Sequence, residues 1–338
     1  MKRLRIAAGA AVSVALVVWL LRSVDLPELG RQLAATQWWW VVPTAVVGPL
    51  GIWGRARRWR YLFPPRSEPP GLVAANMIGY MANNILPLRA GELVRVYVAA
   101  RHLRAERGVG AGESLWLVGA TIVVERVIDS LSLVLIMAVL ILVIPVPPAF
   151  QYAAGAILAL DAVAAAVLIA LALAPAPSRR VLVRLTRRWP ALAHRAERGF
   201  DMVLLGLEGV RTRAHLVPLL VWTVPIWSIS ALGAWTLLRA MHLDLTLVAG
   251  WTVMAFVGFG ISIPSAPGYV GVWHAATVLA LAIFGVSQPV ALGYAVLYHA
   301  SQFVPITLLG WLFLLREHVS LGEVTRAPAS DLAAPHGH

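Results

Sequence analysis

The chain contains no cysteine among its 338 residues, which excludes disulfides, thiolate catalysis and cysteine-ligated metals. Only 13% of the residues are charged, which is about half the share found in an average soluble protein. Three signatures of catalysis are also missing: the H-E-x-x-H zinc motif, the P-loop and the G-x-S-x-G nucleophile turn. These absences predict a chain that is not an enzyme and that holds no metal and no cofactor.

Apolar residues are abundant instead. They make up 59% of the chain, and the mean hydropathy is +0.77. Several apolar runs approach or exceed the ~20 residues that a helix needs to cross a bilayer. We therefore predict an all-α fold, a polytopic integral membrane helical bundle of about seven or eight helices with one or two re-entrant hairpins.

The net charge of +12 comes from arginines placed between the apolar segments. Nucleic-acid binding is the rival explanation of such a charge, but the arginines are not gathered in one soluble domain. Their placement is typical of topology determinants, which are enriched in cytoplasmic loops. We predict no nucleic-acid partner, and a multi-pass protein of the cytoplasmic membrane with both termini in the cytoplasm.

The first two spans follow from the same rule. A basic N-terminus precedes the apolar run Ile6–Leu21, and no A-x-A cleavage pattern follows it closely. We interpret this run as a retained first helix. The second span opens at Trp38 and ends at the arginine-rich stretch Arg55–Arg60, which we take as a cytoplasmic marker.

A break interrupts the next apolar run. Residues 71–86 are too few to cross a bilayer comfortably, and arginines flank residues 71–100 on both sides. We predict a re-entrant hairpin over residues 71–100, and two full spans are the alternative. Two amides and a proline mark the break, and charged residues at a three-residue spacing follow on one helix face: Asn83, Asn84, Pro87, Arg89, Glu92 and Arg95.

A second charged group lies inside the apolar stretch Ser114–Ile144. This stretch is longer than the core of a bilayer, so we expect its helix to be tilted, kinked or broken. The group consists of Glu125, Arg126 and Asp129. Asp129 lies within one helical turn of both other residues and is therefore expected to meet them.

The second half carries another broken element. Two apolar arms over residues 247–286 are joined by a turn that contains Pro264, Pro267 and Gly268, and they form either a hairpin or two full spans. A hairpin there would enter from the side opposite to the first one. Opposed broken helices in the two halves are the pattern of inverted-repeat transporters.

The chain is predicted to form one membrane domain over residues 1–316. Within it, the arginine-rich segment 175–214 is expected to be cytoplasmic and to form amphipathic helices against anionic lipid. The Ala/Pro-rich tail, residues 317–338, is predicted to be disordered.

Three ordered motifs carry a family resemblance: Asn83-Asn84-Ile85-Leu86-Pro87-x-Arg89-x-Gly91-Glu92-x-x-Arg95, Glu125-Arg126-x-x-Asp129 and Pro264-x-x-Pro267-Gly268-x-x-Gly271. They resemble the membrane domain of lysylphosphatidylglycerol synthases and the wider group of flippase-like membrane proteins. The resemblance covers nearly the whole chain. It implies an integral membrane protein that moves or handles lipids, such as aminoacylated phospholipids or polyprenyl-linked sugars.

Two departures from the family are visible. Its bifunctional synthases carry a soluble aminoacyl-transfer domain after the membrane region, whereas only a short tail follows Arg316 here, so we expect no synthase activity. At the third motif, the family often has a second glycine and then a carboxylate, and this chain has Tyr269 and His274 instead.

The candidate substrate-binding residues are the charged groups, amides and turn residues of these motifs: Asn83, Asn84, Pro87, Arg89, Glu92, Arg95, Glu125, Arg126, Asp129, Pro264, Pro267, Gly268, Gly271 and His274. The arginines are predicted to neutralise a lipid phosphate, because a guanidinium binds two oxygens at once. The carboxylates orient the arginines, the asparagines donate to the headgroup, and the glycines permit close approach. The alternative is architectural, with ion pairs that pin helices together.

The predicted function is lipid translocation, with an anionic phospholipid or a polyprenyl-phosphate-linked lipid as substrate and partner. One alternative is a membrane-embedded lipid-modifying transferase, because a carboxylate at membrane depth can act as its base. Another is a non-catalytic partner of a lipid or cell-envelope synthesis enzyme. A homo-oligomer is also left open.

Overall fold

The computed structural model describes residues 26–86, 90–188, 190–262 and 266–318. Within these ranges every regular element is a helix, which confirms the predicted all-α class. The described helices number twelve α-helices, α2 to α13, and two 3₁₀ turns, η1 and η3. This count exceeds the predicted one because each broken element supplies two helices and the short segments supply three more: α2 (Leu26–Ala35), α8 (Pro175–Thr186) and α9 (Pro190–Arg211).

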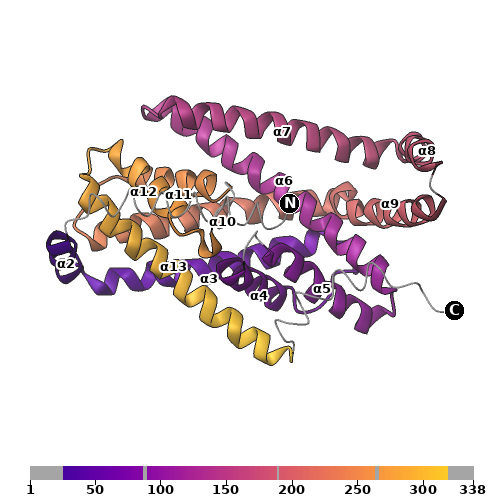
Figure 1. The fold of residues 1–338 in the computed structure, drawn as a ribbon, viewed down its shortest axis with the longest axis horizontal. Helices are drawn as coiled ribbons and strands as arrows, with labels where there is room; N and C mark the ends of the chain where they lie inside the picture. Colours follow the sequence, from indigo (N-terminus) through magenta and orange to yellow (C-terminus); the bar gives the residue numbers. More distant parts are fainter. Residues whose placement is uncertain (1–25, 87–89, 189, 263–265, 319–338) are drawn as a thin grey trace.

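Four helices among the described residues are long and apolar enough to cross a membrane. Figure 1 shows α7 and α10 along the long axis of the molecule, while α6 and α13 run obliquely to it. An oblique course suits the 33 residues of α6, which exceed the length needed for a core of about 30 Å. The chain is therefore a multi-pass membrane protein. The four are α6 (Ala111–Val143), α7 (Pro148–Leu173), α10 (Arg213–Ala240) and α13 (Gln288–Arg316).

A further long helix, α3 (Trp38–Trp59), packs along α10. Small residues let the two helices approach, because a Cβ at Gly54 would lie 3.2 Å from Ile226 Cγ1. Thr44 strengthens the contact, since its hydroxyl lies 2.9 Å from that of Thr236. The 3₁₀ turn η1 (Arg60–Leu62) then ends the helix.

The first broken element is a helical hairpin of α4 (Leu72–Ile85) and α5 (Gly91–Arg107), which pack against each other. Helix α4 stops because Leu86, the residue before a proline, has extended backbone angles. The Gly91 amide donates a hydrogen bond of 2.9 Å to Asn83 Oδ1, which ties the start of α5 to the end of α4. The two arms therefore turn back on each other, as the sequence predicts for a hairpin.

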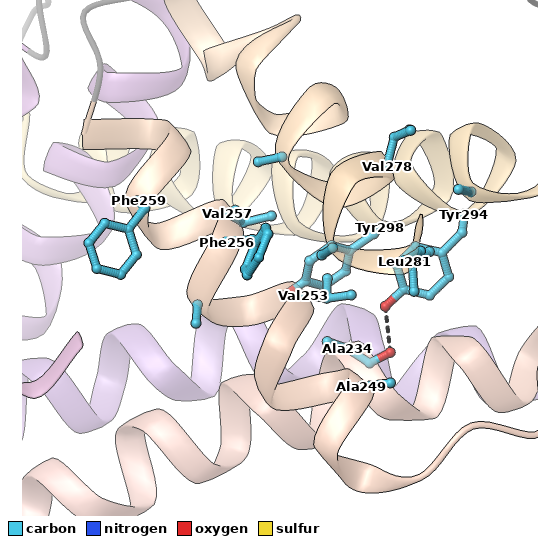
Figure 2. Close-up of a cluster of buried hydrophobic side chains, with 14 of the residues drawn as sticks. Ala234, Ala249, Val253, Phe256, Val257, Phe259, Val278, Leu281, Tyr294 and Tyr298 are labelled. Carbon is cyan, nitrogen blue, oxygen red and sulfur yellow. Dashed lines mark hydrogen bonds between the residues drawn. The ribbon is translucent and has the colours of Figure 1, made fainter. Parts of the chain in front are cut away.

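The second broken element is a hairpin of α11 (Leu247–Ser262) and α12 (Val272–Ala282), with η3 (Pro267–Tyr269) in its turn. Its core is shown in Figure 2, where side chains of α11 and α12 surround Tyr294 and Tyr298 of α13. The buried Tyr294 hydroxyl donates a hydrogen bond of 2.5 Å to the carbonyl of Ala234 on α10. This bond satisfies a polar group that would otherwise be costly in an apolar core.

The turns of the two hairpins meet. Gly268 in η3 has a φ of +68°, and a Cβ there would lie 3.2 Å from the carbonyl oxygen of Asn84 at the end of α4. The arms extend in opposite directions: α5 lies toward the end of the molecule with α8 and α9, and α12 toward the end with α2 (Figure 1). The two hairpins therefore touch at their turns and extend toward opposite ends of the molecule.

The arginine-rich segment 175–214 forms α8 and α9, joined by an ion pair between Arg179 and Asp201. Helix α9 packs on α6 and η1, where a Cβ at Gly206 would lie 2.7 Å from that of Ala120. The segment is thus helical, as predicted. The predicted first helix and most of the predicted disordered tail lie outside the described residues.

Candidate functional site

Charged residues from three helices converge inside the bundle. Five of them are predicted site residues from α5 and α6, and the other two come from α3. Together they form what we call the ionic cluster: Arg55, Arg58, Glu92, Arg95, Glu125, Arg126 and Asp129. Ionisable side chains inside a membrane protein are energetically costly. They are therefore rare, and they usually mark functional pathways.

Arg95 and Glu125 form the centre of the ionic cluster. Both side chains are completely buried, and Arg95 Nη2 lies 2.6 Å from Glu125 Oε2. Arg95 also binds Glu92 at 3.1 Å, and its guanidinium lies 4.7 Å from the centre of the Trp59 ring. The pair joins α5 to α6, and the aromatic face covers the cation.

Asp129 is held by arginines of α3. Arg58, whose side chain is fully buried, donates to Asp129 Oδ1 at 2.6 Å, and Arg55 binds Oδ2. Arg58 also donates to Thr223 of α10 at 3.2 Å. The predicted pair of Arg126 and Asp129 is present at 3.3 Å, but it is one of three ion pairs that Asp129 makes.

The stretch Arg55–Arg60, predicted to mark the cytoplasmic side, also supplies two arginines to the ionic cluster. Arg55 and Arg58 lie within α3 and inside the bundle, whereas Arg57 is exposed. Spacing alone could not single out this pair, because the exposed Arg57 and Arg60 are also three residues apart.

Arg126 is the accessible member of the ionic cluster. Its side chain is 34% exposed, against 0% for Arg58 and Arg95 and 14% for Arg55. It binds Glu125 at 2.8 Å, and Glu92 and Asp129 lie farther away. The cluster has four arginines and three carboxylates, so it keeps one positive charge, and Arg126 is its most exposed arginine. Such an arrangement is suited to binding an anion.

The two asparagines make contacts within the protein. Asn83 is buried and its Oδ1 accepts the hydrogen bond from Gly91, and Asn84 Nδ2 donates to Thr307 of α13 at 2.9 Å. Both amides thus stabilise helix contacts. Three other predicted site residues, Pro87, Arg89 and Pro264, lie outside the described residues.

The predicted residues of the second hairpin form a separate group at its turn. Gly268 permits the close approach to α4, as predicted, and Gly271 has a φ of +91° that favours glycine. Pro267 opens η3. The Gly271 amide donates to His274 Nδ1 at 3.4 Å, so His274 caps the start of α12.

Asp161 is a polar residue that the sequence reasoning missed. It is the one acidic or basic residue in α7 and is 6% exposed. Ser130, the neighbour of Asp129 in α6, donates to Asp161 Oδ1 at 2.6 Å, and Oδ2 is buried with no partner among the described residues. A lone carboxylate in an apolar run of this length was a readable signal, because such residues are rarely accidental.

Replacing Ser130 by alanine is expected to lower the free energy of unfolding by about 1–3 kcal/mol, because both Asp161 oxygens then lack a donor. Adding Asp161→Leu should recover most of this loss, since no unsatisfied group remains. Thermal unfolding in detergent measures both effects. Ser132→Ala is the matched control, because the Ser132 hydroxyl binds a carbonyl of its own helix at 2.7 Å. Equal stability of Ser130→Ala and Ser132→Ala would contradict the role of Ser130.

Comparison with known protein families identifies the family of this chain. A family model described as the lysylphosphatidylglycerol synthase transmembrane region matches residues 6–310. No curated protein and no solved structure matches the chain. The matched range contains the whole ionic cluster and both hairpins. The chain therefore belongs to the lysylphosphatidylglycerol synthase transmembrane-region family and so to lipid-related membrane biology.

Proposed function

We propose that the protein is a lipid transporter that moves a lipid with an anionic headgroup, an anionic phospholipid or a polyprenyl-phosphate-linked lipid, across the cytoplasmic membrane. The observation that carries this proposal is the ionic cluster with its excess positive charge and its one accessible arginine, Arg126. In this proposal Arg126 binds the lipid phosphate. The arginine-rich end with α8 and α9 faces the cytoplasm by the positive-inside rule.

The buried ion pairs prepare Arg126 for this role. Glu125 binds both Arg95 and Arg126, so the carboxylate fixes the accessible guanidinium from behind. An arginine held in one orientation loses little conformational entropy when it binds two phosphate oxygens. A phosphate that replaces weak contacts to Glu92, at 3.6 Å, leaves the buried pairs intact. The site can therefore take up and release an anion without unfolding.

The hairpins support transport as well. In inverted-repeat transporters, broken helices from the two halves meet near the midplane, and one half moves against the other. Here the turns of the two hairpins touch at Asn84 and Gly268. We propose that both are re-entrant and that their contact separates the two sides of the membrane.

The transferase alternative has less support. It needs a carboxylate that is free to accept a proton from a substrate. In the ionic cluster, Asp129 binds three arginines and Glu125 binds Arg95 and Arg126. Carboxylates held by this many cations are poor bases. We accordingly propose a non-enzymatic role with membrane lipids as the partners.

Arg126→Gln is expected to lower translocation of fluorescent phosphatidylglycerol by about 10- to 150-fold, the value of a charge-assisted hydrogen bond. Arg126→Lys should lie between wild type and Arg126→Gln, because lysine keeps the charge but not the planar fork. The measurement uses vesicles with matched amounts of folded protein. Arg239→Gln is the control, because Arg239 pairs with exposed Asp244. Full activity of Arg126→Gln would contradict the proposal.

A further inference from the structure

An apolar crevice lies between α3 and α10. Gly51 contributes to it, because it leaves the surface of α3 without a side chain, and a Cβ there would meet nothing within 4 Å. Its lining comes from both helices: Leu50, Gly51, Trp53, Gly54, Trp222, Pro225, Ile226 and Ile229. The lining is almost wholly apolar. Water therefore finds few hydrogen-bond partners there, whereas a hydrocarbon chain makes favourable van der Waals contacts.

The crevice faces the lipid and not the ionic cluster. Two large apolar side chains of its lining are exposed, Leu50 at 42% and Trp53 at 36%, as expected of a surface in contact with acyl chains. Arg55 points into the bundle, and Trp53 and Arg57 lie two residues on either side of it. Residues two apart on a helix point to nearly opposite sides. No residue of the ionic cluster lines the crevice, so the crevice is distinct from the proposed transport site.

A cation marks one end of the crevice. Arg57 lies one helical turn beyond Trp53, is exposed, and has no ion pair with any residue that the structure describes. Its guanidinium lies 5.2 Å from the centre of the Trp53 ring, and Trp53 in turn meets Trp222 edge-on at 5.5 Å. An apolar crevice that ends at two tryptophans and a cation without an ion pair complements a lipid with a negative phosphate.

We propose that this crevice is a second lipid-binding site, in which one acyl chain of an anionic phospholipid lies between α3 and α10 and Arg57 binds its phosphate. This site goes beyond the proposed transport function. The lipid held there is resident and is not the transported molecule. Its acyl chain takes the place of the side chain that Gly51 lacks, and its phosphate neutralises a cation that otherwise faces the membrane surface alone.

The test uses phosphatidylglycerol with a photoreactive diazirine in one acyl chain, incorporated into vesicles with the full-length protein. After irradiation and digestion, mass spectrometry is expected to find lipid adducts on the peptides that contain Trp53 and Trp222. Arg57→Gln should reduce these adducts about tenfold or more, as expected for loss of a charge-assisted bond. Diacylglycerol with the same diazirine group has no phosphate. It should label the wild-type protein only weakly, at the level that phosphatidylglycerol reaches with Arg57→Gln.

Gly51→Leu fills the crevice and should remove the adducts, whereas Gly155→Leu should not. Gly155 is a matched control because a Cβ there also meets nothing within 4 Å. Equal labelling of wild type and Gly51→Leu would overturn the proposal. Absence of adducts in wild type would also overturn it, and would favour residues 6–21 or a second copy of the protein as the occupant of the crevice. Arg126→Gln should keep the adducts, so failure of the transport proposal and failure of this one are distinguishable.

Discussion

Asp129→Leu is expected to lower the free energy of unfolding by about 3–5 kcal/mol, a large part of the stability of the folded protein. Asp129 is the ion-pair partner of both Arg55 and Arg58, and the next carboxylate to Arg58 is Glu125 at 3.9 Å. Without Asp129, a fully buried guanidinium keeps its charge and loses its closest anion. A domain of ordinary stability has only about 5–15 kcal/mol to lose.

The measurement is the yield of monodisperse protein in detergent, together with its thermal unfolding midpoint. Asp201→Leu is the matched control, because Asp201 pairs with Arg179 and both side chains are 45% exposed. An exposed pair contributes about 0–1 kcal/mol, so this variant should unfold close to wild type. If both variants unfold at the same temperature, the ionic cluster does not stabilise the fold in the way that its geometry implies.

The fold could be predicted largely from the lengths of the apolar runs and from the prolines that interrupt them. The runs around residues 114–144, 150–174 and 289–315 gave helices with ends within a few residues of the observed ones, because apolar length sets the span of a membrane helix. The helix pairs α4–α5 and α11–α12 followed from short apolar arms joined at proline. Helix α2 and the division of segment 175–214 into two helices depend on local packing, which leaves little trace in hydropathy.

The ionic cluster could be predicted only in part. Spacing of three and four residues placed Glu92 with Arg95, and Arg126 with Asp129, on common helix faces. Arg55 and Arg58 were missed because an arginine that sets topology and an arginine that enters the bundle have the same composition around them. Which face of α3 turns inward depends on its contact with α10, and that contact rests on glycines and threonines spread over the helix.

The asparagines show a different limit. Asn83 and Asn84 stand beside a proline break, where either a ligand or the protein itself can use their amides. Asn83 binds Gly91 eight residues later, and Asn84 binds Thr307 more than 200 residues later. Neither partner can be read from local spacing, because only the folded hairpin brings them together.

A glycine that the sequence reasoning did not single out controls how closely the first hairpin closes. Gly79 in α4 lies against α5, where a Cβ would overlap the aliphatic part of Arg95 and lie 2.9 Å from the carbonyl oxygen of Gly91. A Cβ at Gly91 would in turn overlap the carbonyl oxygen of Gly79. The two backbones therefore touch, and this contact sets the position from which Arg95 reaches Glu125.

Gly79→Leu is accordingly expected to lower the free energy of unfolding by about 3 kcal/mol, the upper end of the range for overpacking. Helix propensity alone predicts the opposite sign, since glycine in a helix interior costs roughly 0.5–1 kcal/mol relative to a good helix former. Gly119→Leu in α6 separates the two effects, because a Cβ at Gly119 meets nothing within 4 Å. Thermal unfolding in detergent should show Gly79→Leu below wild type and Gly119→Leu at or above it. If Gly79→Leu and Gly119→Leu unfold at the same temperature, α4 and α5 do not pack at the distance described. The buried pair of Arg95 and Glu125 would then lose its structural basis.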